Sequence, residues 1–252
     1  MKVKPINNTI CKTLNVRYTD CFYREQTNIV SILNFFNEIA QEAGYYYDQE
    51  KNILKDESLA WIILNWDIDV NRYPKYRERV KVCTIARAID RFIAFREFQI
   101  LDEKDQLLAR GKSKWILLNL EKRRPAVARD YMYDLYGVTE TEPPFTISKP
   151  LEFKGKGDEQ ILFRVRKRDV DGYEHVNNTV YAYWINEAVP DEVTDRMMLR
   201  NVRIYYKRET TYPNDVLIHN EVKEQGHILH RIDRTDGKNL VYAESCWENK
   251  QV

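Results

Sequence analysis

The sequence predicts an α+β fold made of two tandem repeats, each a long helix wrapped by a curled antiparallel sheet. Two stretches have the apolar pattern of a helix, one near residues 28–43 and one that ends before Pro190. Each is followed by several runs rich in β-branched and aromatic residues, which are typical of strands. Short residue matches also recur at corresponding points of the two halves, which indicates an internal duplication.

Length and composition restrict the classes of protein that the chain can belong to. Its 252 residues suffice for one large or two ordinary domains, and 40 basic against 39 acidic residues give a net charge of +1. Wholesale nucleic-acid binding needs a strong positive excess and is not expected. No apolar run approaches the roughly 18–20 residues of a membrane span. The first residues lack the apolar core of a signal peptide, so we expect a cytoplasmic protein.

The four cysteines have no CxxC spacing. They are Cys11, Cys21, Cys83 and Cys246. This spacing does not favour a zinc site, and reduced structural thiols are expected in a cytoplasm.

In the first half, a short strand is expected at residues 16–20 and an amphipathic helix from Asn28 to Ala43, with Gly44 just after its end. Strand-like runs follow, with a turn at 102–105 and a bulge at Gly111. These runs cover residues 61–70, 79–85, 92–101 and 107–120.

The second half is expected to repeat this order after a linker. We predict a first repeat at residues 1–121, a proline-containing linker at 122–160 with a short helix near Tyr131, and a second repeat at 161–252. Asp236-Gly237 is a strong hairpin signal. The expected strands of this half cover residues 162–168, 199–208, 215–223, 227–234 and 240–247.

Two residue matches support the duplication. Tyr73-Pro74 corresponds to Tyr212-Pro213, and the run from Ala109 to Trp115 corresponds to Ala243 to Trp247. A duplicated helix wrapped by a sheet is the double hotdog arrangement, in which the sheets of the two halves would pair edge to edge. The alternative is two α+β domains that merely share an order of elements.

The stretch from Asp169 to Pro190 joins a polar loop to an apolar helix. Asn177 or Asn178 is expected to cap the helix, and Pro190 to end it. Because Val180 to Ala188 shows no clear polar face, this helix is expected to be buried.

This stretch resembles a known family. Asp-Val-Asp-Gly-Tyr-Glu-His-Val-Asn-Asn at 169–178, with Tyr181 and Trp184 behind it, is similar to the motif of the acyl-acyl carrier protein thioesterases, the plant FatA/FatB enzymes and their bacterial relatives. Tyr206 to Thr210 stands where the family has Tyr-x-x-Glu-Cys. The resemblance implies hydrolysis of the thioester between a fatty acyl chain and the phosphopantetheine arm of acyl carrier protein, without metal or organic cofactor.

Two residues depart from the family motif. Tyr173 replaces an asparagine, which changes the hydrogen-bonding groups offered at that position, and Thr210 replaces a cysteine. The second change argues against a cysteine nucleophile in this chain.

The resemblance implies that Asp171, His175 and Glu209 are the catalytic residues. We expect Glu209 to activate or position water and His175 to orient that water or the thioester carbonyl. Asp171 would either hold His175 or attack directly. Backbone amides at the helix N-terminus are expected to stabilise the oxyanion. No catalytic role is expected for His219, His227 or His230.

Expected substrate contacts fall in both halves. In the second half they are Tyr173, Asn177 and Asn178. The first half lacks the histidine in its matching loop, so it is expected to form the acyl pocket, with Ile32, Phe36 and Trp61 as candidate lining.

Acyl carrier protein is acidic, so a basic docking face is expected beside the catalytic loop. Its candidates are Arg164, Arg166, Lys167, Arg168, Arg196, Arg200, Arg203, Lys207 and Arg208. Two alternatives stay open, an acyl-CoA thioesterase and a non-catalytic acyl-binding hotdog protein. The oligomeric state is also open, with a homodimer as one option.

Overall fold

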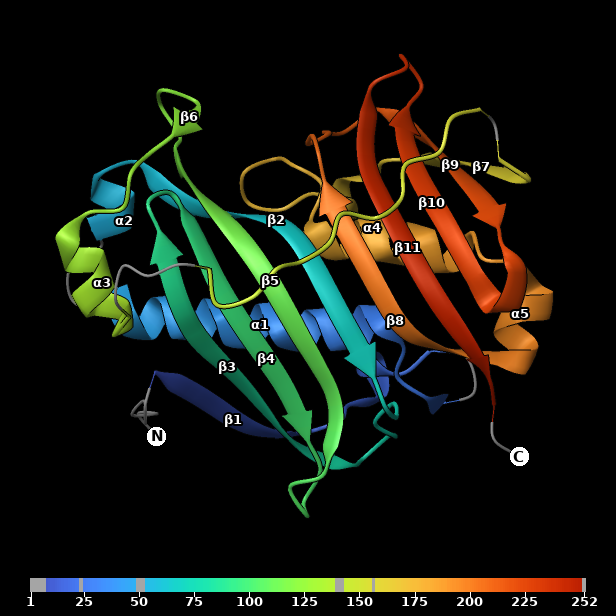
Figure 1. Ribbon diagram of the computed structural model, residues 1–252, viewed down its shortest axis with the longest axis horizontal. Helices are drawn as coiled ribbons and strands as arrows, with labels where there is room; N and C mark the ends of the chain where they lie inside the picture. The colour runs from blue at the N-terminus through green and yellow to red at the C-terminus, as the bar shows by residue number, and fades with distance from the viewer. Residues whose placement is uncertain (1–7, 23–24, 49–52, 139–142, 156, 251–252) are drawn as a thin grey trace. The chain divides into compact units, whose positions relative to one another are not determined.

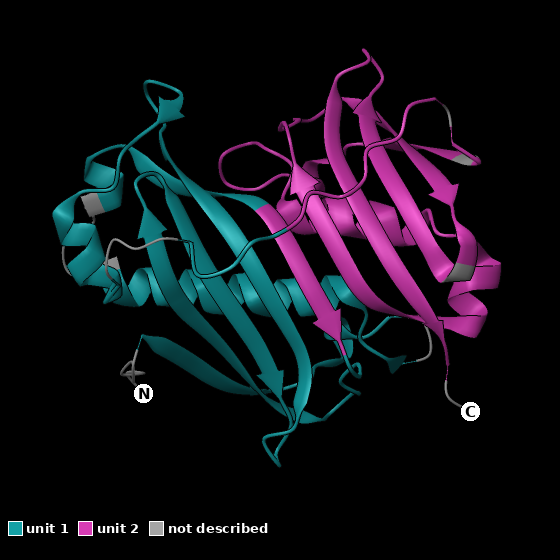
Figure 2. Cartoon of the chain, viewed as in Figure 1, with its two compact units in different colours: residues 1–64, 71–147 teal, residues 65–70, 148–252 magenta. Residues whose placement is uncertain are grey.

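A computed structural model describes residues 8–22, 25–48, 53–138, 143–155 and 157–250. The chain divides into two compact units, which Figure 2 distinguishes by colour. Unit 1 contains residues 1–64 and 71–147, and unit 2 contains residues 65–70 and 148–252. Strand β2 therefore contributes its first part to unit 1 and its last part to unit 2. None of the helices in the described ranges is long and apolar enough to cross a membrane.

Unit 1 is an antiparallel sheet with the long helix α1 along one face (Figure 1). Its strands follow the spatial order β1-β3-β4-β5-β2, and β6 pairs with β5. The elements are β1 (Thr9–Asn15), α1 (Ile29–Asp48), α2 (Ile53–Asp56), β2 (Leu59–Val70), β3 (Arg79–Asp90), β4 (Ile93–Leu101), β5 (Leu107–Asn119), β6 (Arg124–Pro125) and α3 (Asp130–Tyr136).

Unit 2 repeats this plan with the shorter helix α4. The end of β2 pairs with β8 through residues 65–69, and the spatial order is β2-β8-β11-β10-β9-β7. The elements are β7 (Glu159–Arg164), α4 (Asn178–Glu187), α5 (Asp191–Arg196), β8 (Met197–Tyr206), β9 (Asp215–Val222), β10 (His227–Arg234) and β11 (Asn239–Asn249). The predicted α+β fold of two helix-and-sheet repeats is confirmed.

The structure corrects the expected start of the first repeat. The first strand is β1 at Thr9–Asn15, and residues 18–20 form a 3₁₀ turn instead of the expected strand at 16–20. In this turn the Asp20 carboxylate accepts from the backbone amide of Arg17 at 2.8 Å. The same arrangement occurs in unit 2, where Asp169 accepts from the amide of Arg166 at 2.8 Å. A polar residue that caps a turn thus replaces strand pairing at both places.

Helix α1 continues past Gly44, where the sequence indicated its end. It runs to Asp48 because its last turn has something to pack against. The ring of Tyr47 lies edge to face against Tyr136 of α3, with centroids 5.2 Å apart. Tertiary packing of this kind outweighs the roughly 1 kcal/mol that a glycine costs inside a helix.

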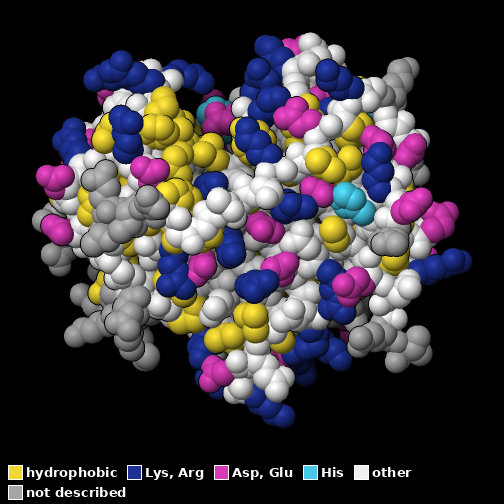
Figure 3. Space-filling view, in the orientation of Figure 1, with side chains coloured by type: hydrophobic (Ala, Val, Ile, Leu, Met, Phe, Trp, Pro, Cys, Tyr) yellow, Lys and Arg dark blue, Asp and Glu magenta, His cyan; other side chains and the backbone are white. Residues whose placement is uncertain are grey.

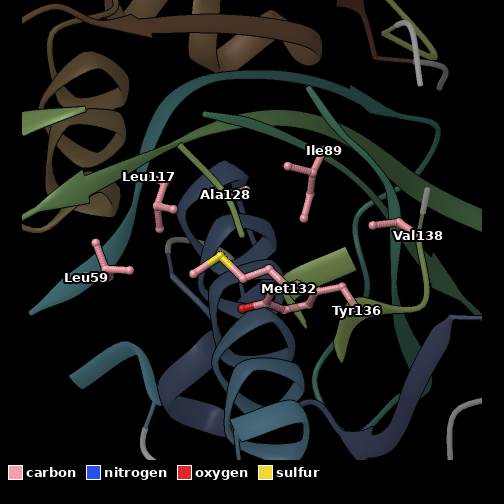
Figure 4. Packing of buried hydrophobic residues seen from close by; sticks show 7 residues of the cluster. All are labelled: Leu59, Ile89, Leu117, Ala128, Met132, Tyr136 and Val138. Carbon is pink, nitrogen blue, oxygen red and sulfur yellow. The ribbon is translucent and has the colours of Figure 1, made fainter. Parts of the chain in front are cut away.

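One cluster of buried apolar residues joins α3 to the sheet of unit 1 (Figure 4). Met132 and Tyr136 of α3 lie beside α1, between Leu59 and Leu117 on one side and Ile89 and Val138 on the other. The helix α3 is the short helix expected near Tyr131. The linker boundaries predicted from the sequence stay a prediction; residues 71–147 belong to unit 1, and the residues from 148 on belong to unit 2.

Cys11 and Cys83 form a disulfide, contrary to the expectation of reduced thiols. The two residues lie directly opposite each other on the neighbouring strands β1 and β3. Cys21 and Cys246 are free thiols. Sequence spacing could not predict the bridge, since it depends on the register of two strands that are 72 residues apart.

Gly111 gives α1 room to approach the sheet, and it does not mark the expected bulge. It pairs regularly with Phe98, and the irregularity in this strand pair lies between Ile100 and Leu101. A Cβ atom at Gly111 would lie 2.7 Å from Cε2 of Phe36. Phe36 in turn packs against Phe98, with ring centroids 4.9 Å apart. Glycine is therefore needed here for close packing, not for an unusual backbone angle.

We expect Gly111→Ala to lower the free energy of unfolding by about 1–3 kcal/mol, because overpacking a core forces neighbouring side chains to move. Chemical denaturation measures this change. The change Phe36→Leu combined with Gly111→Ala should cost less than the sum of the two single changes. Gly44→Ala is the matched control, since nothing lies within 4 Å of its added Cβ; it should stabilise α1 by about 0.5–1 kcal/mol. Equal effects of the two alanine changes would contradict this account.

Candidate active site

The loop at residues 169–177 is closed by its own backbone. The amide of Asp171 donates to the carbonyl of His175 at 2.8 Å, and the amide of Glu174 donates to the carbonyl of Asp171 at 3.0 Å. Glu174 has a φ of +65°, which this tight turn requires. Val170 and Val176 form an antiparallel bridge across its base. The turn therefore presents the side chains of Asp171 and His175 from a defined backbone.

A second short pairing joins this loop to the segment after β8. His175 forms an antiparallel bridge with Thr211, and the amide of Val176 donates to the carbonyl of Thr210 at 2.9 Å. The pairing brings Nδ1 of His175 within 3.3 Å of Oε2 of Glu209. Both side chains keep access to solvent, with exposed fractions of 32% and 45%. Nε2 of His175 has no partner among the described residues, so it is available to hydrogen-bond a substrate.

Asp171 contacts the main chain of the loop rather than the imidazole. Its Oδ1 accepts from the amide of Tyr173 at 2.9 Å and from the amide of His175 at 3.3 Å. Asp171 thus contacts His175 through the backbone. Tyr173 is 64% exposed, so the phenol of this unusual residue lies at the surface of the loop.

Asn177 caps α4. Its side-chain oxygen accepts from the amide of Thr179 at 3.0 Å, and its carbonyl accepts from the amide of Val180 at 3.0 Å. The amide of Asn177 itself donates to the carbonyl of Asp169. These three amides at the start of the helix are therefore already engaged. The expected stabilisation of an oxyanion by amides at this helix N-terminus stays a prediction. The buried side of α4 is as expected, with Tyr181, Trp184 and their apolar neighbours inside.

Unit 1 contains a loop with the same backbone bonds but without the counterparts of Asp171 and His175. The amide of Phe22 donates to the carbonyl of Gln26, that of Glu25 donates to the carbonyl of Phe22, and Gln26 bridges Lys75. Asn28 caps α1 as Asn177 caps α4, by accepting from the amide two residues ahead at 2.9 Å. Phe22 therefore corresponds to Asp171, and Gln26 corresponds to His175. The backbone of the site is duplicated, and its acid and histidine occur only in unit 2.

Two buried hydroxyl groups next to Glu209 were missed by the sequence analysis. The phenol of Tyr181 and the hydroxyl of Thr210 are both buried without a hydrogen-bond partner among the described residues. Burial raises the pKa of Tyr181, and the charges of Glu209 and Asp171 raise it further. The main chain of Thr210 lies near the phenol and partly offsets the rise in the pKa of Tyr181. The phenol nevertheless has no hydrogen-bond partner among the described residues. Only the three-dimensional arrangement reveals such groups.

The remaining histidines of unit 2 have other partners. His230 is fully buried, with Nδ1 at 2.7 Å from Asn220 Oδ1 and Nε2 at 2.7 Å from Ser245 Oγ. Burial lowers its pKa to about 3, so the ring is neutral. His227 pairs with Glu244, and His219 with Asp233. Within the described ranges, no three His, Cys, Asp or Glu side chains gather closely enough to hold a metal ion.

The residues expected to line an acyl pocket lie in unit 1. Ile32 and Phe36 of α1 are fully buried in its core. Trp61 is partly buried and lies edge to face against Tyr136, with centroids 6.4 Å apart. Their contact with substrate stays a prediction.

Two protein-family models match the chain. The acyl-ACP thioesterase N-terminal domain matches residues 7–136, and the C-terminal domain of the same enzymes matches residues 154–249. The oleoyl-acyl carrier protein thioesterase of Coriandrum sativum is 26% identical over 249 residues, covering 91% of this chain and 67% of that protein. An Arabidopsis thaliana oleoyl-acyl carrier protein thioesterase is 25% identical over 77% of this chain, which spans 58% of its length. Both relatives are chloroplastic.

A crystal structure from Lactobacillus plantarum, assigned as an oleoyl thioesterase, has the same fold. It superposes with a TM-score of 0.88 at 21% sequence identity and covers 97% of both chains.

The two buried tyrosines of the site should respond oppositely to loss of their hydroxyl groups. Tyr181→Phe removes an unpartnered group, so we expect the free energy of unfolding to stay equal or to rise by up to about 1 kcal/mol. Tyr206→Phe is the matched control, since its hydroxyl donates to the carbonyl of Asn178 at 3.0 Å; it should cost about 1 kcal/mol. Chemical denaturation of both variants measures the difference. A loss at Tyr181 as large as that at Tyr206 would show that the Tyr181 hydroxyl has a partner.

Proposed function

This chain belongs to the acyl-ACP thioesterase family, and we propose that it hydrolyses the thioester of fatty acyl-acyl carrier protein to release free fatty acid. The observation that carries the proposal is the contact of Glu209, which follows β8, with His175 in a loop that also holds Asp171. The equivalent loop of unit 1 has the same backbone bonds and has Phe22 and Gln26 in the places of Asp171 and His175. The chemistry is therefore assigned to unit 2.

Glu209 and His175 can act together on a water molecule. With Oε2 of Glu209 near Nδ1, that nitrogen carries the proton, and the lone pair of Nε2 accepts from the attacking water. Glu209 acts on this water through the imidazole, because its carboxylate lies on the Nδ1 side of the ring. The water oxygen bonds to the thioester carbon, its proton passes to this pair, and the carbon–sulfur bond breaks. The pair then returns the proton to the leaving thiolate.

Comparison of the two loops supports a chemical role for Asp171. Its carboxylate accepts from two backbone amides, which by itself is typical of a residue that merely shapes a turn. The loop of unit 1 keeps the same backbone bonds with Phe22 in this position. A carboxylate is therefore not required for the shape of the loop. We infer that Asp171 serves as the second carboxylate of the site, either by orienting His175 through its amide or by direct attack on the carbonyl.

In this proposal the acyl chain binds in unit 1, where it contacts Ile32 and Phe36 of the helix and Trp61 of the sheet. Tyr173, Asn177 and Asn178 belong to the proposed substrate-binding side of unit 2. Hydrolysis of acyl-CoA is the alternative within enzymes, and non-catalytic acyl binding is the alternative outside them. A thiol-release assay with matched acyl carrier protein and CoA thioesters separates all three.

A cytoplasmic location and a homodimeric assembly stay predictions. The bridge between Cys11 and Cys83 bears on the first, because disulfides are uncommon in a reducing cytoplasm.

The docking face is proposed at residues 166–168, directly before the catalytic loop. Lys167 and Arg168 are exposed, whereas Arg200 and Arg203 are engaged with Glu248 and Glu244. In the view of Figure 3, Lys and Arg side chains alternate with Asp and Glu, so a local cluster matters more than net charge. An acidic carrier protein would be attracted to the exposed side chains of Lys167 and Arg168.

Glu209→Gln and Asp171→Asn should each lower kcat by about 10²–10⁴-fold, because an amide cannot accept the proton or attack as a carboxylate does. Steady-state thiol release measures the loss, and unchanged thermal unfolding shows that the fold persists. Glu174→Gln is the matched control in the same loop and should keep normal turnover. Near-normal turnover of either test variant would remove that residue from the proposed mechanism.

Lys167→Glu combined with Arg168→Glu should lower kcat/KM for acyl-acyl carrier protein by about tenfold or more at low salt, with little change for a small acyl thioester. The reason is loss of electrostatic attraction, which added salt also screens. Lys104→Glu, in an exposed turn of unit 1, is the control for net charge. A kcat/KM that is insensitive both to salt and to these changes contradicts docking at this place.

A further inference from the structure

Arg96 of β4 lies on the helix-facing side of the sheet in unit 1. It is two residues from Phe98, which packs against Phe36 of α1, so both side chains leave the same face of the strand. Its neighbours across the sheet are Ala86 on β3 and Ser113 on β5. A guanidinium group thus lies among residues that otherwise form an apolar interior.

This guanidinium has little to bind within the protein. Its Nη1 donates to Oγ1 of Thr84 at 3.1 Å, and it has no carboxylate partner among the described residues. The ionisable groups that influence it are the phenols of Tyr136 and Tyr47, and burial lowers its pKa. A guanidinium has five N–H donors, and burying one without an acidic partner is costly. Most of its donors are therefore left for another group.

The residues near Arg96 include small side chains and a second polar group. Beyond Phe36, the next residues on the same face of α1 are the small Ala40 and Ala43, followed by Tyr47. The hydroxyl of Tyr47 is buried without a hydrogen-bond partner among the described residues. Arg96 itself keeps part of its surface accessible. Among the described residues, the Tyr47 hydroxyl thus has no hydrogen-bond partner, and Arg96 has a hydroxyl partner but no carboxylate.

Unit 2 provides an internal comparison. Trp247 donates to Ser245 there at 2.8 Å, as Trp115 donates to Ser113 in unit 1 at 2.7 Å. The polar residue beside Ser245 is His230, whose two ring nitrogens are both bonded within the protein. A buried polar residue with a structural role is thus fully satisfied in one repeat. Arg96, beside Ser113 in the other repeat, is not satisfied in this way.

We propose that Arg96, with Thr84 and Tyr47, forms a polar subsite in unit 1 that binds an acceptor oxygen on the acyl chain of the substrate. A carboxylate is the strongest candidate, since it accepts two parallel bonds from guanidinium. A hydroxyl group on the chain offers the same acceptor chemistry more weakly. The inference rests on the proposed function, because it assigns the substrate class of the same enzyme. Its preferred substrates carry oxygen on the chain rather than an unmodified hydrocarbon end.

A binding experiment tests the subsite without requiring turnover. The probes are three methyl esters of equal chain length, unsubstituted, ω-hydroxylated and ω-carboxylated, each taken over a series of lengths. Isothermal titration calorimetry on the full chain gives their Kd values. We expect the ω-carboxylated ester to bind at least about tenfold more tightly than the unsubstituted ester, with the ω-hydroxylated ester between them. Equal affinity for the three esters at every length overturns the proposal.

Two variants assign any preference to the subsite. Arg96→Gln should raise the Kd of the ω-carboxylated ester to that of the unsubstituted one. Tyr47→Phe removes only an unpartnered hydroxyl, so it should fold normally and lose part of the preference even where Arg96→Gln does not fold. Arg87→Gln is the control, because Arg87 is exposed and pairs with Glu97. A preference that survives both Arg96→Gln and Tyr47→Phe, or a preference that Tyr47→Phe leaves intact when Arg96→Gln is unfolded, overturns the proposal.

Thiol release from acyl carrier protein thioesters of the same three chains separates this inference from the proposed function. No release from any chain would contradict the proposed hydrolysis, while the binding data would still decide the subsite. Release from all three with equal kcat/KM would support hydrolysis and contradict the subsite.

Discussion

The pairing of the loop at residues 170–176 with residues 210–211 is the constraint on which the candidate site depends. It consists of one bridge and one backbone bond, His175 with Thr211 and Val176 with Thr210. This pairing is what brings Glu209, at the end of β8, next to His175, which precedes α4. Backbone bonds fix the main chain, and side-chain geometry follows from them. The site can therefore tolerate changes such as Tyr173, which contributes its amide and leaves its ring exposed.

Duplication explains how the two units can differ in chemistry while sharing a fold. Phe22 and Gln26 occupy in unit 1 the places of Asp171 and His175, with the same main-chain bonds. The backbone of the loop therefore forms in both units, and only the loop of unit 2 carries Asp171 and His175. The serine and tryptophan pairs of β5 and β11 likewise recur in both units, with Ser113 opposite Arg96 on the neighbouring strand and Ser245 bonded to His230. Each repeat keeps the scaffold and changes what the scaffold carries.

The family resemblance pointed to His175 and Glu209, whose side chains lie 3.3 Å apart and whose catalytic roles stay a prediction. Sequence patterns predicted most of the elements, because residue type and order carry that information. They failed where long-range packing or register decides. Helix α1 continues through Gly44 because Tyr47 packs on Tyr136, which is 89 positions further along the chain. The disulfide depends on the register of β1 against β3. A glycine within a strand pattern suggests a bulge, and the sequence gives no sign that Gly111 instead contacts Phe36 of α1.

Hydrogen-bond satisfaction separates structural from functional polar residues in this chain, and no sequence pattern reports it. Buried polar groups in folded proteins are nearly always partnered, so each exception needs a cause. His230 and Tyr206 follow the rule. Tyr181 and Thr210 beside Glu209 break it, as does Tyr47 near Arg96. These three groups lie beside the proposed catalytic pair or within the repeat proposed for the acyl chain, and the side-chain oxygen of Asn239 is a further exception without a proposed role.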